Sequence, residues 1–409
     1  MARTRKWRLR WAAGVTAVMT AAVLSAIAPP AQAAPAGRIL GAGEPGSVDG
    51  SYIVTLKGDG RAPSATAATA VAARYGARIS HTYGTVLDGF AVRAGRRAAR
   101  LLAADPRVAS VVQDTRVTLA GATDSGAAPG RAEKDPPSWG LDRIDQRARP
   151  LDGRYTAPGS QGAGVTVYVI DTGIRITHRD FGGRASYGWD FVDDDATAQD
   201  GNGHGTHVAG TVAGTSYGVA KRARVVAVRV LDDRGAGSTA QVIAGIDWVT
   251  RHARRPAVAN LSLGGYANAQ LDAAVRNSIA SGVTYTVAAG NYGLPASLYS
   301  PARVAQALTV GATDRNDARA PFSDTGASLD LFAPGVDITS TSYTGDMARA
   351  IGSGTSMASP HAAGAAALYL AGHPRAAPAQ VVKALVRHAV PGKVSNAGPG
   401  SPNRLLNVG

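Results

Sequence analysis

The 409-residue chain contains no cysteine, and residues 135–409 contain no glutamate. Without thiols the chain cannot form a disulfide framework, a thiolate zinc site or a cysteine nucleophile. Any carboxylate chemistry in the long C-terminal part must therefore use aspartate. Charged residues are few, at 18 %, while 45 % of residues are hydrophobic, which excludes a disordered chain and allows a sizeable core.

Positive charge is unevenly distributed along the chain. The formal net charge is +14, but residues 1–134 carry 18 Lys and Arg against 8 Asp and Glu, and residues 135–409 carry 25 against 21. A nucleic-acid-binding protein concentrates its basic residues on the domain that does the binding. We therefore expect no nucleic-acid partner.

The first 33 residues have the three-part pattern of a secretory signal peptide. A basic block ends at Arg10, an apolar stretch covers 11–28, and Ala31-Gln32-Ala33 forms a small-x-small cleavage site. A membrane anchor is the alternative, but Gly, Ser and Thr interrupt the stretch, and no later run approaches the ~20 apolar residues of a span. We expect residues 1–33 to be removed and the mature protein to be secreted, without contact with the membrane.

Residues 34–130 predict a small domain of their own. Strand-like and helical patterns follow in the order β-α-β-β-α-β, which is typical of a ferredoxin-like α+β unit. A stretch rich in Gly, Ala, Asp and Pro, 120–137, then has the composition of a linker. The expected strands and helices are 52–56, 65–75, 79–83, 87–93, 96–105 and 108–113.

Residues 131–409 alternate between apolar strands and amphipathic helices. Continuous apolar runs are typical of strands covered on both faces, and helical periodicity lies between them. The runs are 165–170, 225–231, 257–263, 283–289 and 308–310. This alternation predicts one three-layer α/β domain with a mostly parallel central sheet.

Three motifs in this domain carry chemically useful side chains. Asp171 follows a buried strand, His204 opens a helix after a Gly-rich turn, and Ser356 lies at or just before a helix N-terminus. We expect Pro360 in the first turn of that helix. An imidazole can take the proton of a serine hydroxyl while a carboxylate orients the imidazole. The motifs therefore predict nucleophilic catalysis by Ser356.

A fourth polar group, Asn291, follows another buried strand and offers an amide donor for an oxyanion. Two other interpretations of these motifs remain. Asp171 can serve only as a turn residue, and His204 with His207 can bind a metal. The metal interpretation lacks the glutamate that usually accompanies such a pair, because none follows in this part of the chain.

Together these motifs resemble the subtilisin-like serine proteases. The resemblance rests on Asp171 in VIDTGI, His204 in HGTHVAGT, Asn291 in AAGN and Ser356 in GTSMASPHAAG, in that order, and it covers about residues 138–409. The opening SWGLDRIDQ is similar to the proteinase K and aqualysin types. The resemblance implies a monomeric endopeptidase acting on proteins or peptides, and packing roles for His207, Ser359 and His361.

The family also implies that residues 34–130 form an inhibitor-type propeptide and that the chain processes itself. Such a propeptide acts as an intramolecular chaperone, and its tail lies in the active-site cleft until it is cut away. The enzyme would then be made as a zymogen.

The substrate cleft is expected along a strand that ends in glycines. A peptide backbone could approach 260–265 and pair with it as an added strand, and 235–237 would flank the peptide as in the family. No charged side chain lines the expected pocket, so a bulky apolar residue before the cut bond is expected. The expected substrate-binding residues are Gly237, Ser262, Leu263, Gly264, Ala288, Ala289 and Gly290.

Calcium is the expected cofactor, with a role in stability. One cluster of oxygen ligands suits a hard cation and resembles a thermitase loop: Asp190, Asp193, Asp195, Thr197 and Gln199. Asp330 with the carbonyls of Ala305 and Ala307 matches a proteinase K site. A third, aqualysin-type group comprises Asp142, Asp145, Gln146 and Asp152. Solvated acidic turns are the alternative for these segments.

Two other classes of protein are compatible with parts of the pattern. An α/β-hydrolase esterase also uses Ser, His and Asp, but its nucleophile lies in Gly-x-Ser-x-Gly, whereas Ser356 lies in Gly-Thr-Ser-Met-Ala. A non-catalytic binding module with the same fold would lack one of the catalytic groups, and none is missing.

Overall fold

The computed structural model describes residues 37–58, 65–119, 123–125 and 138–409. The described residues exclude the predicted signal peptide, the domain boundary expected at residue 130, and residues 120–122 and 126–137 of the predicted linker. The described residues belong to one compact unit, Ala36–Gly409. Within them, no helix is both long and apolar enough to cross a membrane.

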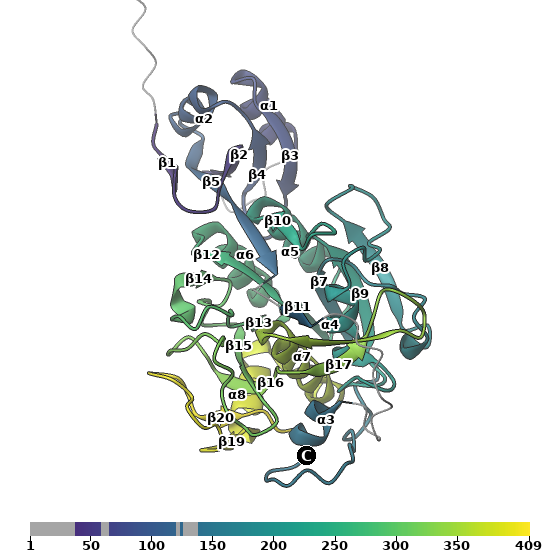
Figure 1. Cartoon of the computed structure of the whole chain (residues 1–409). Helices are drawn as coiled ribbons and strands as arrows, with labels where there is room; N and C mark the ends of the chain where they lie inside the picture. The colour runs from purple at the N-terminus through teal and green to yellow at the C-terminus, as the bar shows by residue number, and fades with distance from the viewer. Residues whose placement is uncertain (1–36, 59–64, 120–122, 126–137) are drawn as a thin grey trace, which may run out of the picture. The chain divides into compact units, whose positions relative to one another are not determined.

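Residues 37–119, here called the N-terminal subdomain, have the predicted β-α-β-β-α-β order after an additional two-residue strand, β1. The elements are β1 (Ile39–Leu40), β2 (Ser47–Leu56), α1 (Ala65–Arg74), β3 (Arg78–Tyr83), β4 (Gly89–Arg93), α2 (Arg96–Ala103) and β5 (Val108–Leu119). The main strands form an antiparallel sheet in the order β5-β2-β4-β3, which is the ferredoxin-like arrangement (Figure 1).

Both faces of this small sheet are buried, because alternate residues of a strand point to opposite faces. Tyr52 and Val54 of β2 pack with α1 and α2 in one apolar cluster. Ile53, between them, belongs to a different cluster, which includes Val242 and Ile246 of the helix that follows β10. The second face of the small sheet therefore packs against the rest of the chain.

Residues 138–409, here called the C-terminal domain, contain the large sheet. Its elements are α3 (Trp139–Ile144), β7 (Thr166–Asp171), η1 (Arg179–Phe181), β8 (Ala185–Asp190), α4 (His204–Ala213), β9 (Arg224–Arg229), β10 (Ala236–Ser238), α5 (Thr239–His252), β11 (Ala257–Leu261), β12 (Leu263–Tyr266), α6 (Ala269–Ala280), β13 (Thr284–Ala288), η2 (Ala296–Leu298), β14 (Tyr299–Ser300), β15 (Leu308–Thr313), β16 (Leu331–Pro334), β17 (Ile338–Thr341), β18 (Arg349–Ser353), α7 (Thr355–Gly372), α8 (Pro378–His388), β19 (Val390–Pro391) and β20 (Arg404–Leu405).

The large sheet has the order β8-β9-β7-β11-β13-β15-β16-β20-β19, and only its last pair, β19–β20, is antiparallel. Val167 and Val169 of β7 pack into a cluster with α4 and α7, whereas Tyr168 and Ile170 pack into a cluster with α5 and α6. Helices therefore cover both faces, and the predicted three-layer, mostly parallel fold is confirmed (Figure 1).

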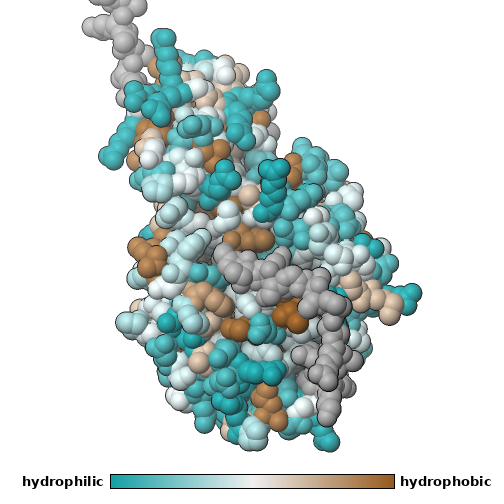
Figure 2. All heavy atoms as spheres, viewed as in Figure 1, coloured by the Kyte–Doolittle hydropathy of each residue, from teal (hydrophilic) through white to brown (hydrophobic). Residues whose placement is uncertain are grey.

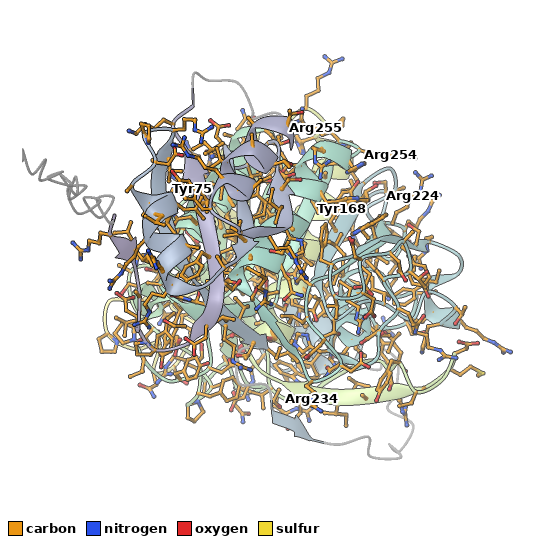
Figure 3. All side chains as sticks on the ribbon, turned by 90° about the horizontal axis from the view of Figure 1, so that it is seen from above. Tyr75, Tyr168, Arg224, Arg234, Arg254 and Arg255 are labelled. Carbon is orange, nitrogen blue, oxygen red and sulfur yellow. The ribbon has the colours of Figure 1, made fainter. Side chains whose placement is uncertain are left out.

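The two edges of the large sheet differ in character. Arg224 begins β9, and Arg254 and Arg255 precede β11, so basic side chains gather where parallel strands start (Figure 3). Asp171 ends β7 at the opposite edge. In the view of Figure 2 the surface is mainly hydrophilic, and apolar side chains form small separate groups.

Candidate active site

Asp171 and His204 meet at the carboxyl edge of the large sheet. Asp171 is the last residue of β7, and His204 is the first residue of α4. The His204 Nδ1 atom lies 2.7 Å from Asp171 Oδ1, and the same oxygen accepts a hydrogen bond from the Thr172 N–H at 2.8 Å. Both side chains are buried, so the carboxylate can orient the imidazole in a medium where water competes little.

The turn that delivers His204 is held by a residue that the sequence interpretation missed, Asp200. Its Oδ1 accepts from the Asn202 and Gly203 N–H groups at 2.9 and 2.8 Å and from Thr172 Oγ1 at 2.9 Å. Its Oδ2 accepts from the N–H and hydroxyl of Thr206. Asp200 therefore connects the strand that ends at Asp171 to the start of α4. An Asp followed by Gly-Asn-Gly before a helix was the available signal.

Ser356 is the second residue of α7, as expected of a serine at a helix N-terminus. Its Oγ lies 3.0 Å from the carbonyl oxygen of Ser262, and both residues are fully buried. The expected position of Pro360 in the first turn is wrong. Since α7 begins at Thr355, Pro360 lies inside the helix, four residues after Ser356.

The orientation of the Asn291 amide follows from its neighbours. Asn291 Oδ1 accepts hydrogen bonds from both the N–H and the hydroxyl of Thr355, each at 2.8 Å. A Cβ atom built on Gly354 would lie 3.0 Å from Asn291 Nδ2. The amide oxygen is therefore engaged by Thr355, the first residue of α7, and the amide nitrogen lies near Gly354, the residue before that helix.

The C-terminal end of β5 lies between two strands of the C-terminal domain. Val117 and Thr118 pair with Gly237 and Ala236 of β10, and Thr118 also pairs with Gly264 of β12, both antiparallel. The Leu119 N–H donates to the Gly235 carbonyl at 3.0 Å. Residues 116–119 thus occupy the groove that the sequence predicted for an added peptide strand.

A small apolar pocket lies beside this groove. The structure brings together Leu263, Gly264, Ala288, Ala289 and Gly290 from the predicted set, whereas Gly237 and Ser262 are not part of the lining. The sequence interpretation missed Tyr292 and Tyr299, which also line the pocket and stack with ring centroids 4.8 Å apart. Nothing in the sequence around these two tyrosines predicts that they line a pocket, because their proximity depends on the fold.

In the first predicted calcium cluster, residues 190–199, the carboxylates pair with the guanidinium group of Arg229. Arg229 Nη1 lies 2.6 Å from both Asp190 Oδ2 and Asp193 Oδ2, and Nη2 lies 2.8 Å from Asp233 Oδ1. Asp195 Oδ1 accepts from the Thr197 N–H at 2.6 Å, and the side-chain Oε1 of Gln199 accepts from the Tyr187 hydroxyl. This arrangement does not fit calcium, because a guanidinium neutralises the carboxylates and protein donors engage the other oxygens. No group of three or more acidic or His side chains in the described parts of the chain is arranged to hold a metal ion.

The second and third calcium groups lack such a neutralising contact. Burial raises the pKa of Asp330 to about 6, opposed only by a hydrogen bond from the Thr309 N–H at 2.8 Å. Ala305 and Ala307 lie just before that threonine. Burial also raises the pKa of Asp142 and Asp145, and neighbouring carboxylates, Asp152 among them, add to both shifts. A bound divalent cation would relieve this electrostatic cost, but backbone N–H groups already bond to the carboxylates of Asp142 and Asp145, and the third group forms no metal-binding cluster as it stands.

Comparison with known proteins identifies both parts of the chain. The model of the subtilase family matches residues 162–409, and that of peptidase inhibitor I9 matches residues 51–120. An extracellular serine proteinase of a Thermus species is 47 % identical over 405 residues, covering 94 % of this chain and 96 % of its own. An alkaline serine exoprotease A of Vibrio alginolyticus is 48 % identical over 81 % of this chain and 60 % of its own length.

Solved structures agree with this result. A cold-adapted subtilisin-like serine proteinase is 51 % identical, with a TM-score of 0.64, over 66 % of this chain and 97 % of its own. Fervidolysin of Fervidobacterium pennivorans shares the fold, at 22 % identity and a TM-score of 0.73, over 92 % of this chain and 63 % of its own.

The fold and these matches define a serine peptidase that carries an inhibitor-type propeptide. The chain belongs to the subtilase family. An esterase of the α/β-hydrolase class is thereby excluded.

Proposed function

We propose that this chain is a secreted, self-processing serine endopeptidase whose catalytic residues are Asp171, His204, Ser356 and Asn291. The observation that carries the proposal is the position of residues 116–119 in the groove between β10 and β12. Leu119 pairs with Leu263, which follows Ser262, and the Ser262 carbonyl lies 3.0 Å from Ser356 Oγ. A peptide segment is thereby held where a substrate would be presented to Ser356. The names of extracellular relatives and the signal-like N-terminus support secretion.

We assign each of these residues a role in the reaction. His204, oriented by Asp171 through the 2.7 Å contact, takes the proton of the Ser356 hydroxyl as Ser356 attacks the peptide carbonyl. His204 then gives that proton to the leaving amine, and a water molecule, deprotonated by His204, cleaves the acyl group from Ser356, which regains its proton. The Asn291 amide and the Ser356 N–H stabilise the oxyanion, because both donors are fixed before charge develops.

The described strands limit the place of self-cleavage. β5 ends at Leu119, beside Leu263, and β6 (Thr123–Ser125) pairs with β18 so that Thr123 lies opposite Ser353, close before Ser356 in the chain. The chain is thus held by strand pairing at Leu119 and again at Thr123. We infer that the first cut breaks a peptide bond between Leu119 and Thr123. The propeptide would then end several residues before the boundary expected near residue 130.

After this cut the propeptide would remain bound as an inhibitor. The carboxylate of Asp114 supports this role, because its Oδ1 accepts from the Ala240 N–H at the start of α5 at 3.0 Å. Tyr83 donates to the Ala240 carbonyl at 3.1 Å, and Asn277 donates to the Val86 carbonyl at 2.7 Å. These contacts lie away from the cleavage region and would survive the cut.

The pocket supports a preference for apolar side chains before the cut bond, because its lining contains no charged residue. Calcium would stabilise the fold at Asp330, with the carbonyls of Ala305 and Ala307, and at the group around Asp142. It takes no part in bond cleavage. The mature enzyme would act as a monomer.

The test is full-length Ser356→Ala. We expect one unprocessed precursor that cleaves no casein, whereas the Ser160→Ala control, in an exposed turn, matures normally. N-terminal sequencing of the first wild-type product should place the new end within 120–123. Processing of the Ser356→Ala precursor in a host without other proteases would refute the proposal.

A further inference from the structure

The carbonyl group of Ser356 has an unusual position in its helix. In an α-helix, the carbonyl of residue i accepts from the N–H of residue i+4. For Ser356 that residue is Pro360, which has no N–H. The Ser356 carbonyl instead accepts a hydrogen bond from Ser262 Oγ at 2.8 Å. A side chain from outside the helix thus replaces the missing backbone donor.

The Ser262 hydroxyl is itself held by Asn260, the residue two positions earlier in the chain. Asn260 Nδ2 lies 2.9 Å from Ser262 Oγ. Asn260 Oδ1 accepts from Ser359 Oγ of α7 at 2.7 Å and from Thr286 Oγ1 of β13 at 2.9 Å. All of these side chains are fully buried, so water does not compete for the hydrogen bonds.

The polarity of these hydrogen bonds is fixed by their chemistry. Because Asn260 Oδ1 accepts two hydroxyl donors, its Nδ2 group is the donor toward Ser262 Oγ. The Ser262 proton is then free for the Ser356 carbonyl. Ser356 Oγ in turn lies 3.0 Å from the Ser262 carbonyl, so two contacts join these residues.

We propose that Asn260 is a positioning residue for the nucleophile, acting through the Ser262 hydroxyl on the carbonyl that Pro360 leaves without its helical partner. This inference rests on the proposed role of Ser356. Asn260 touches neither the reacting atoms nor the cleft. It sets the backbone of Ser356, and thereby the angle at which the hydroxyl meets the substrate, where a displacement of about 1 Å costs ~10²-fold in rate.

The test compares Asn260→Ala, Ser262→Ala and the double variant after self-processing of the full chain. We expect kcat per titrated active site to fall about 10- to 100-fold, with KM changed less than about twofold. The fall in kcat of the double variant should not exceed that of the more impaired single variant, because both changes break the same connection. Tyr285→Phe is the control, because it removes another buried hydroxyl, bonded to Ser278 at 2.8 Å, and should leave kcat unchanged.

Pro360→Ala provides a second arm, which does not depend on the folding of Asn260→Ala. Alanine restores an N–H for the Ser356 carbonyl, so Ser262→Ala should cost less than about threefold in that background. An equal cost in both backgrounds would overturn the proposal. So would a loss seen only as fewer titratable sites, with an unchanged rate per site. Retained activity in Ser356→Ala would instead overturn the proposed function itself.

Discussion

Thr355 determines which end of the Asn291 amide faces the start of α7, because both of its donors bond to Asn291 Oδ1. The sequence predicted an amide at this place, but not its orientation, which depends on a residue 64 positions away. At the residue scale, the chemical identity of a side chain can be predicted from the sequence, whereas its orientation depends on partners that are distant in the sequence. Asp200 and Arg229 are further examples, since their partners lie on other segments.

Replacement of Asn291 tests the oxyanion role. Asn291→Ala should lower kcat by about 10²–10³, the loss known for one such donor in subtilisin itself, with little change in KM. Thr355→Val, which releases one bond to the amide oxygen, should cost less. Steady-state kinetics on a peptide substrate checks both. An Asn291→Ala variant that retains wild-type kcat would contradict the assignment.

Two buried histidines predict sensitivity to acid. Burial lowers the pKa of His207 and of His361 to about 4, from an ordinary value of about 6.5. Between these values the unfolded chain binds protons that the folded chain does not, so stability falls as pH drops from about 6.5 to 4, by up to about 3 kcal/mol for each residue.

Denaturant unfolding at several pH values measures this slope. His361→Asn should show a shallower acid dependence than the wild type, although its stability at neutral pH is lower. His373→Asn, at an exposed position, is the control and should keep the wild-type slope. Equal slopes in all three proteins would show that His361 is not buried in its neutral form.

Asp330 predicts dependence on calcium. Its pKa, raised to about 6 by burial, means that the folded state keeps a proton which the unfolded state loses above about pH 4. Stability therefore falls as pH rises from about 4 to 6 and stays lower above that range. A bound cation would remove this cost, so at pH 8 calcium should raise the Tm of the wild type. Asp330→Asn should lose most of this shift, and an undiminished shift would exclude the site.

At the scale of elements, the alternating pattern predicted the main elements of the N-terminal subdomain and strands β7, β9, β11, β13 and β15 of the large sheet, but not β8, β16 or β20. Two differences have physical reasons. The apolar run 257–263 divides into β11 and β12, because the chain leaves the large sheet and pairs with β5 instead. The strand expected at 108–113 extends to Leu119, because its second half pairs with the C-terminal domain. Sequence periodicity contains no information on such distant partners.

The contact between α5 and the loop before β4 predicts how tightly the propeptide is held. Asp247 Oδ1 accepts from the N–H groups of Gly84, Thr85 and Val86 at 3.1, 2.7 and 3.0 Å, and Asp247 is fully buried. Arg251 Nε lies 3.0 Å from Oδ2. Asp247→Asn removes the charge from these hydrogen bonds, so the cleaved propeptide should dissociate about 10- to 100-fold faster.

The interval between cleavage, followed on a gel, and the appearance of peptidase activity measures this release. The Asp247→Asn interval should be much shorter, and Arg251→Ala should have a smaller effect because the three N–H donors remain. An unchanged interval for Asp247→Asn would mean that other contacts retain the propeptide.

At the scale of the whole molecule, the sequence predicted two folded parts and their fold classes, because each part has its own pattern of hydrophobic strands and helices and its own core. Its linker-like composition gave only an approximate boundary near residue 130. Strand pairing at Leu119 and again at Thr123 moves the proposed cut to the segment between them, a result of tertiary structure. Likewise, the carboxylate of Asp190 in the predicted calcium loop pairs with Arg229, which lies on a different strand.

The central claim is that Asp171, His204 and Ser356 act as one unit. The most direct test labels the processed enzyme with a fluorophosphonate and locates the label by peptide mass spectrometry. We predict that the label is on Ser356 alone, and that labelling slows by about 10⁴-fold or more in His204→Ala after its propeptide has been cut away by added wild-type enzyme. A label on another residue of the active enzyme, or an unchanged rate in His204→Ala, would contradict the account.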